Sequence, residues 1–84
     1  MVVATQETDR FDYAVHLIRG RRVVEDRWSL VRIELATGTR GTFKLSRDQR
    51  HDRLFLSQRD QRAIGIEGLQ ALERMARALW PRRP

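Results

Sequence analysis

The spacing of apolar residues changes once along the chain, and this change restricts the fold more than any other feature of the sequence. Between Phe11 and Leu56, apolar and polar residues alternate in several short stretches, which is the period-two pattern of strands with one buried face. From Leu69 to Leu79, apolar residues recur every three or four positions, as in an amphipathic helix. A chain of 84 residues has room for one domain and one small core. We therefore expect an α+β fold: an antiparallel sheet of four or five strands followed by one C-terminal amphipathic helix packed on one face.

Turn-forming residues divide the first part of the chain into strands. The stretches "RGRR" at 19–22 and "TGTRG" at 37–41 supply glycines suited to tight turns, and the second is expected to close a hairpin. Residues 23–26 continue either as a short return or as an irregular loop. The two ends, 1–10 and 81–84, are expected to be flexible tails. Strands are thus expected at 11–17, 28–36, 42–45 and 53–57, with a last short strand at Ile64 and Ile66.

The tetrapeptide Arg-Asp-Gln-Arg occurs twice, at 47–50 and at 59–62. Ser46 and Gln49 match a capping box, so a helix that begins with the first copy must be considered. Such a helix would have no buried stripe, because the apolar residues between the copies, 54–56, are adjacent rather than three or four positions apart. We therefore expect two turns, one on each side of a short strand.

The alternation also assigns strand residues to the two faces of the sheet. The side chains expected beneath the helix are Val31, Ile33, Leu35, Phe43, Leu45, Leu54 and Leu56. The outer face then receives Trp28, Leu30, Arg32, Lys44, Arg53 and Phe55. Two aromatic side chains and three cations would therefore share one exposed surface.

The charge of the chain favours a polyanionic partner. Seventeen basic residues against eleven acidic ones give a formal net charge of +6, and nucleic acid is the first partner that such an excess indicates. Sixteen of the basic residues are arginine, a preference that the codon usage of a GC-rich genome also explains. Codon usage does not explain why basic residues outnumber acidic ones, so the prediction of a nucleic-acid partner depends on this excess of positive charge.

The outer face and the arginine-rich turns hold the candidate binding residues. Single-stranded nucleic acid needs cations along its backbone and flat side chains on which bases stack, and guanidinium groups serve both purposes. Trp28 and Phe55 can instead be buried in a dimer interface or beneath a loop, and the turn arginines can instead pair with neighbouring aspartates, Asp48, Asp52 and Asp60. The candidates are Arg19, Arg21, Arg22, Trp28, Arg32, Lys44, Arg47, Arg50, Arg53, Phe55, Arg59 and Arg62.

The C-terminal quarter of the chain resembles a known group of proteins. The stretch "RAIGIEGLQALERMARALW" at 62–80 reads as a short strand that passes through a glycine into an amphipathic helix. This order is similar to that in the group of single-stranded nucleic-acid-binding domains that contains the Pur-alpha repeats, the Whirly proteins and positive cofactor four. "RGRRV" from Arg19 lies roughly where a basic turn of such a domain would be. The resemblance implies binding of single strands across a curved sheet, and dimerisation through helices or strand edges.

Other classes of function find little support in the residues. There is no cysteine, so we expect a reducing, cytoplasmic location and neither a disulfide framework nor a thiolate metal cluster. His51 with Asp48 and Asp52 could ligate a metal, but a loop rich in arginine is a poor place to hold a dication. No paired carboxylates, phosphate-binding loop or serine-centred triad stands out, and no stretch has membrane-spanning length. We expect no enzyme activity, no cofactor, no metal and no membrane partner.

Two functions therefore compete. The first is non-enzymatic binding of single-stranded DNA or RNA by a homodimer, through the basic, partly aromatic sheet face and the arginine-rich turns. The second is a protein-protein interaction module or small regulatory subunit that docks on a larger protein complex through Trp28, Leu30 and Phe55. Salt separates them, because phosphate contacts weaken steeply as salt rises whereas an apolar docking surface hardly responds.

Overall fold

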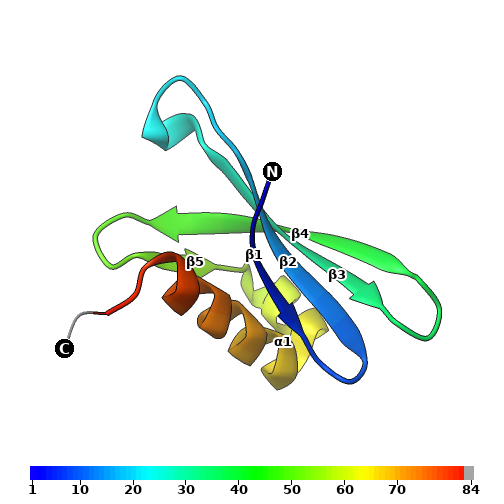
Figure 1. The fold of residues 1–84 in the computed structure, drawn as a ribbon. Helices are drawn as coiled ribbons and strands as arrows, with labels where there is room; N and C mark the ends of the chain where they lie inside the picture. The colour runs from blue at the N-terminus through cyan, green and yellow to red at the C-terminus, as the bar shows by residue number, and fades with distance from the viewer. Residues whose placement is uncertain (83–84) are drawn as a thin grey trace.

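A computed structural model describes residues 1–82 and shows an antiparallel sheet followed by a long helix (Figure 1). The elements are β1 (Val2–Glu7), β2 (Phe11–Ile18), η1 (Val23–Glu25), β3 (Arg27–Glu34), β4 (Arg40–Asp48), β5 (Arg53–Phe55) and α1 (Gln58–Leu79). The five strands are hydrogen-bonded in chain order, each antiparallel to the next. α1 packs mainly against β1, with further contacts to β2 and β5. The predicted α+β fold, an antiparallel sheet of four or five strands with one C-terminal helix on one face, is confirmed, and the sheet has five strands.

Two turns form where the glycines predicted them. Residues 19–22 lie between β2 and η1, outside any strand. The 37–41 segment closes the β3–β4 hairpin, in which Gly38 has a φ of 72° and its N–H donates to the carbonyl of Glu34 at 2.8 Å. A backbone in this left-handed region favours glycine because a Cβ would clash there. Sequence-local turn chemistry thus fixes the connections on both sides of β3.

The N-terminal segment is a strand, and the prediction of a flexible tail over residues 1–10 is wrong. β1 pairs with β2 from Val2 opposite His16 to Glu7 opposite Asp12, with an irregularity after Val2. Its residues include several that favour extended backbone, and Val3 packs against the core. β1 therefore forms one edge of the sheet and gives α1 its main packing partner.

α1 begins earlier than predicted and includes the second Arg-Asp-Gln-Arg. The hydroxyl oxygen of Ser57 caps the helix by accepting a hydrogen bond from the N–H of Asp60 at 3.2 Å. The expected loop at 59–62 and the expected strand at Ile64 and Ile66 are therefore wrong, and the 62–80 segment contains no strand. A serine followed three residues later by an acidic residue is a helix-start signal. The alternation of isoleucine and glycine forms no strand, but Gly65, with a φ of 71° and a ψ of −177°, puts a kink in α1 at this point.

The helix buries one stripe of side chains, as its spacing predicted from Leu69 onward. The buried positions are Ile64, Gly68, Ala71, Leu72 and Met75. At the C-terminal end, the N–H of Trp80 donates to the carbonyl of Ala76 at 2.9 Å, and Pro81 follows as predicted. Of the predicted tail at 81–84, residues 81–82 belong to no helix or strand and 83–84 lie outside the described residues. No helix within residues 1–82 is long and apolar enough to cross a bilayer.

The predicted assignment of β3 to the two faces of the sheet is wrong. Trp28 and Leu30 are 7% and 0% exposed and belong to the core on the helix side, and Arg32 lies on the same face. Val31 and Ile33 therefore point to the opposite face, and Leu35 lies beyond the end of the strand. The reason is that β3 has apolar residues at both even and odd positions, so the alternation alone could not show which face is buried. The cross-strand register decides which face of β3 is buried, because the core residues Val15 of β2 and Leu45 of β4 lie opposite Leu30 and Trp28.

For β4 and β5 the predicted assignment to the two faces is correct. Lys44, Arg53 and Phe55 are exposed and alternate with the buried Leu45 and Leu54.

Candidate nucleic-acid interface

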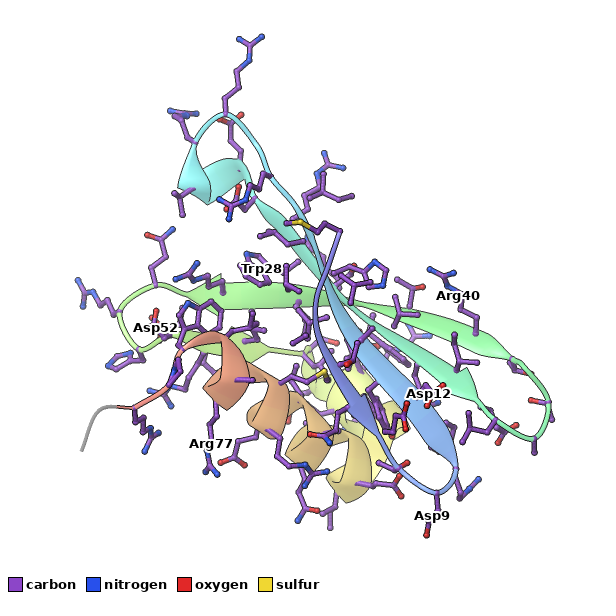
Figure 2. The ribbon with its side chains drawn as sticks, in the orientation of Figure 1. Asp9, Asp12, Trp28, Arg40, Asp52 and Arg77 are labelled. Carbon is purple, nitrogen blue, oxygen red and sulfur yellow. The ribbon has the colours of Figure 1, made fainter. Side chains whose placement is uncertain are left out.

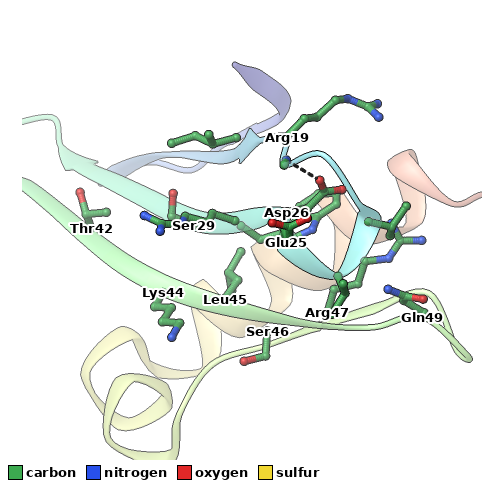
Figure 3. Close-up of a pocket in the computed structure, with 16 residues that line it drawn as sticks. Arg19, Glu25, Asp26, Ser29, Thr42, Lys44, Leu45, Ser46, Arg47 and Gln49 are labelled. Atoms are coloured by element: carbon green, nitrogen blue, oxygen red, sulfur yellow. Dashed lines mark hydrogen bonds between the residues drawn. The ribbon is translucent and has the colours of Figure 1, made fainter.

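A cleft of about 1100 Å³ opens at one end of the sheet, between the β2–β3 turn and the C-terminal half of β4 (Figure 3). β2 and β3 extend as a hairpin past β4, and the turn with η1 forms one wall (Figure 1). Residues Lys44 to Arg47 of β4, together with Gln49, form the other wall. The cleft therefore exists because two consecutive hairpins of the sheet diverge at this end.

The turn that forms one wall is held in shape by its own hydrogen bonds. The N–H of Gly20 donates to Oδ1 of Asp26 at 2.9 Å, as Figure 3 shows. The backbone N–H and the Nε of Arg22 both donate to Oε1 of Glu25 at 3.1 Å. A Cβ on residue 20 would collide with Glu25, so this turn needs glycine there. The two acidic side chains of the turn are thus engaged within the turn itself.

The cations that line the cleft are largely unpaired. Arg19, Arg27 and Lys44 take part in no ion pair among residues 1–82. The acidic residues of the lining are Glu25, which is paired with Arg22 at 3.1 Å, and Asp26, which accepts from the backbone. The charge of Glu25 is balanced by Arg22, and Arg19, Arg27 and Lys44 outnumber Asp26, so the cleft keeps a positive excess for an external anion.

Arg47 lines the cleft, but its guanidinium is engaged with two tryptophans. Its Cζ lies 4.4 Å from the ring centroid of Trp80 and 5.6 Å from that of Trp28. The two rings are themselves in contact, with centroids 5.5 Å apart. Arg47 also pairs with Asp52 at 3.2 Å, and its side chain is only 23% exposed. Arg47 therefore joins β4 to the end of α1, and the charge it offers to the cleft is shared with Asp52.

The structure gathers some predicted binding residues at the cleft and places others elsewhere. Trp28 lines the cleft but is only 7% exposed, with its ring packed against Trp80 and Arg47, so it offers no free face to a base. Arg32 lies at the other end of β3. Arg21, Arg22 and Arg50 are exposed in the two turns next to the cleft. Arg53 and Phe55 lie on β5, with Cζ of Arg53 5.9 Å from the ring of Phe55, which is 43% exposed. Arg59 and Arg62 are exposed on the first turns of α1, and neither lines the cleft.

The sequence reasoning missed Arg27 and the apolar tip of the turn. Arg27 begins β3, is exposed and lines the cleft. Val23 and Val24 of η1 are 58% and 73% exposed, and Ile18 at the end of β2 is 64% exposed. The signal for the tip was present as two adjacent valines next to three arginines, but the stretch contains no periodicity that separates an exposed tip from a buried strand.

The turn between β4 and β5 holds the acids and the histidine once considered as metal ligands. Nδ1 of His51 lies 2.8 Å from Oδ2 of Asp48, and the N–H of Arg50 donates to Oδ1 of the same carboxylate at 2.9 Å. The hydrogen bond from His51 is the main reason why the pKa of Asp48 lies below its ordinary value of 3.8. Within residues 1–82, no three histidine or acidic side chains come close enough together to hold a metal ion.

Comparisons of the chain with known protein families, with curated proteins and with solved structures found no match.

Proposed function

We propose that the protein binds single-stranded DNA or RNA without sequence-specific chemistry, and that the strand lies in the cleft between the β2–β3 turn and β4. The observation that carries this proposal is a set of three cations, Arg19, Arg27 and Lys44, that lie on both walls of one cleft and have no acidic partner within residues 1–82. Such a groove tracks a phosphate backbone, which is the general arrangement for binding single strands. The net charge of +6 supports the same partner.

The contacts to bases differ from those that the sequence suggested. Trp28 and Arg32 have no part in them, because one is buried and the other lies at the far end of β3. Phe55 takes over as the stacking residue: it lies opposite Ser46, a residue of the cleft wall, and is 43% exposed. A base stacked on an aromatic ring contributes about 1 to 3 kcal/mol. Arg53 beside the ring would then hold the adjacent phosphate.

A second candidate function is docking on a protein partner, and the exposed apolar tip favours it. The sequence predicts docking through Trp28, Leu30 and Phe55, but Trp28 and Leu30 are buried and only Phe55 is accessible. Val23 and Val24 provide a replacement surface. A regulatory subunit that docks through this tip would bind its partner by apolar contacts, with little dependence on salt.

A titration of a fluorescently labelled oligonucleotide at two salt concentrations separates the two functions. With four phosphate contacts, from Arg19, Arg27, Lys44 and Arg53, the slope of log affinity against log salt should be about −3, since each contact on a single strand contributes about −0.7. Lys44→Ala and Arg27→Ala should each weaken binding several-fold and reduce the magnitude of the slope by about 0.7. Arg59→Ala is the matched control, because Arg59 is exposed but lies outside the cleft, and it should leave the slope unchanged.

Two results would count against the proposal. No binding of the oligonucleotide at low salt would exclude single-stranded nucleic acid as the partner. Equal losses in Lys44→Ala and Arg59→Ala would show that total charge, not the cleft, determines binding. The expected homodimer is a separate proposal, and sedimentation equilibrium of the free protein tests it directly.

A further inference from the structure

A second hollow, of about 540 Å³, lies on the helix side of the sheet at the end away from the cleft. It is bounded by the start of β2, the end of β3, the start of β4 and residues 63–67 of α1. No residue of the cleft lines it. Figure 2 shows the separation: Arg40, a residue of this hollow, and Asp52, the partner of Arg47, lie at opposite ends of the molecule.

Arg32 presents to this hollow a guanidinium that has no acidic partner among residues 1–82. Its Cζ lies 4.5 Å from the ring centroid of Phe11 and 5.5 Å from that of Phe43. Among residues 1–82, it takes part in no ion pair, and it lies close enough to the hydroxyl of Tyr13 to lower the pKa of that group. Aromatic rings interact with the face of a guanidinium, whereas its N–H donors lie in its plane. These in-plane donors fit the two oxygens of a carboxylate as a paired fork.

Tyr13 places a second polar group beside Arg32. It lies directly opposite Arg32 in the β2–β3 register, is 2% exposed, and lines the hollow. Its hydroxyl is buried without a hydrogen bond among the described residues. Burial raises the pKa of this hydroxyl most, the carboxylate of Glu67 raises it further, and the neighbouring guanidinium of Arg32 lowers it in part. The pKa stays above its ordinary value, so the hydroxyl is a neutral donor at pH 7. A buried hydroxyl without a partner is costly, and an oxygen ligand would remove that cost.

The charges around the hollow sum to one positive charge. The lining contains three cations, Arg10, Arg32 and Arg40, and two acids, Glu34 and Glu67. Glu34 is engaged by Arg10 at 3.6 Å and by the hydroxyl of Thr37 at 2.8 Å. Three minus two leaves +1, which matches a monoanion better than a doubly charged phosphate.

The remaining wall is apolar and comes from the kink in α1. Gly65 has a φ of 71°, which interrupts the helix, and nothing lies within 4 Å of the place where a Cβ would be. Ala63 and Ile66 flank it, and Ile66 is 76% exposed although it is a large aliphatic residue. This wall offers an apolar surface beside the cationic fork, which is the combination that a ligand with one charged end and one apolar end requires.

We propose that the hollow binds a small organic monocarboxylate with an apolar body, whose carboxylate accepts hydrogen bonds from Arg32 and from the hydroxyl of Tyr13. The apolar body lies against Ala63, Gly65 and Ile66. This binding is independent of nucleic acid, since it uses none of the residues of the cleft.

An NMR titration of the ¹⁵N-labelled full-length chain tests the site with hexanoate, acetate, hexanol and inorganic phosphate as probes. Hexanoate should produce saturable shifts of the amides of Gly41, Gly65 and Ile66. Acetate should bind more weakly because it lacks the apolar body, and hexanol should not saturate because it lacks the charge. Phosphate bound as tightly as hexanoate would overturn the assignment to a carboxylate ligand, and so would the absence of a saturable shift with hexanoate.

Substitutions in the hollow test where the carboxylate and the apolar body of the ligand lie. Arg32→Lys keeps the charge between the rings but loses the fork, so affinity for hexanoate should fall at least about tenfold. The matched control in the same strand is Arg27→Lys, which should bind hexanoate normally. Glu67→Gln should tighten binding, because it removes a competing negative charge. Unchanged affinity in folded Arg32→Lys would overturn the proposal.

A surface variant keeps the test independent of folding. Ile66 is 76% exposed, so Ile66→Ser should leave the fold intact. It should weaken hexanoate about threefold and leave acetate unaffected, because only hexanoate reaches this wall. An equal effect on both acids, or none on hexanoate, would contradict the placement of the apolar body.

Discussion

The two copies of Arg-Asp-Gln-Arg have the same four side chains and different structures. The first copy, 47–50, ends β4 and enters the turn to β5, whereas the second, 59–62, forms the first turns of α1. Neither copy contains an apolar residue that could fix its own orientation toward the core. The preceding residues decide instead: Leu45 continues the strand alternation into the first copy, and Ser57 caps the helix that contains the second. A short polar sequence thus adopts the backbone that its neighbours impose.

The first arginine of each copy shows how far this difference reaches. Arg47 lies against the rings of Trp80 and Trp28, and its side chain is 23% exposed. Arg59 is exposed on the helix and forms no ion pair among the described residues. The same residue type in the same tetrapeptide is therefore a packing element in one place and a solvated charge in the other.

Replacing these two arginines by alanine should give the largest difference in stability between the copies. Arg47→Ala removes a partly desolvated cation between two tryptophan rings and the packing of its stem, and should lower the free energy of unfolding by about 2 kcal/mol. Arg59→Ala should change it by less than about 0.5 kcal/mol. Urea denaturation followed by tryptophan fluorescence measures both. Equal losses would show that the stacking of Arg47 contributes nothing beyond charge.

Two serines that precede the copies provide a test of intermediate size. Ser57→Ala removes the hydroxyl that accepts from the N–H of Asp60, and loss of an N-cap costs about 1 kcal/mol. Ser46→Ala changes an exposed residue of β4 with no side-chain hydrogen bond among those described, and should cost less than about 0.5 kcal/mol. Far-UV circular dichroism during denaturation reports both. If Ser46→Ala costs as much as Ser57→Ala, capping does not explain why the second copy is helical.

The comparison also explains which parts of the fold the sequence could predict. The 37–41 hairpin and the helix from Leu69 onward depend on local turn chemistry and on an unmixed apolar spacing, and both were predicted. β3 was assigned to the wrong faces because it carries Trp28 and Leu30 at one parity and Val31 and Ile33 at the other. Only the pairing of β3 with β2 and β4, which the sequence does not reveal, shows which of these two sets of side chains faces the core.

The candidate site was predictable in its composition but not in its geometry. The cationic character of the β2–β3 turn and of Lys44 followed from the sequence and the alternation of β4. The stacking of Arg47 on Trp80 did not, because those residues meet only when α1 folds back along the sheet. Arg27 was missed because the predicted strand began at Trp28, one residue after β3 begins, so no face was assigned to Arg27.

The aspartate of the first copy gives the smallest expected effect and the most local one. Asp48 accepts from His51 and from the N–H of Arg50, and these bonds hold its pKa below 3.8. Because the folded value is lowered, the carboxylate stabilises the turn above about pH 3.8, and this contribution is lost as the pH falls through the lower, folded value. Carboxyl-detected NMR should show Asp48 titrating below 3.8, and His51→Ala should raise its pKa, since the bond from His51 is the largest cause of the shift. A pKa that does not change in His51→Ala would mean that the backbone of the turn alone holds the charge, and that the histidine following this copy of the tetrapeptide plays no part in its conformation.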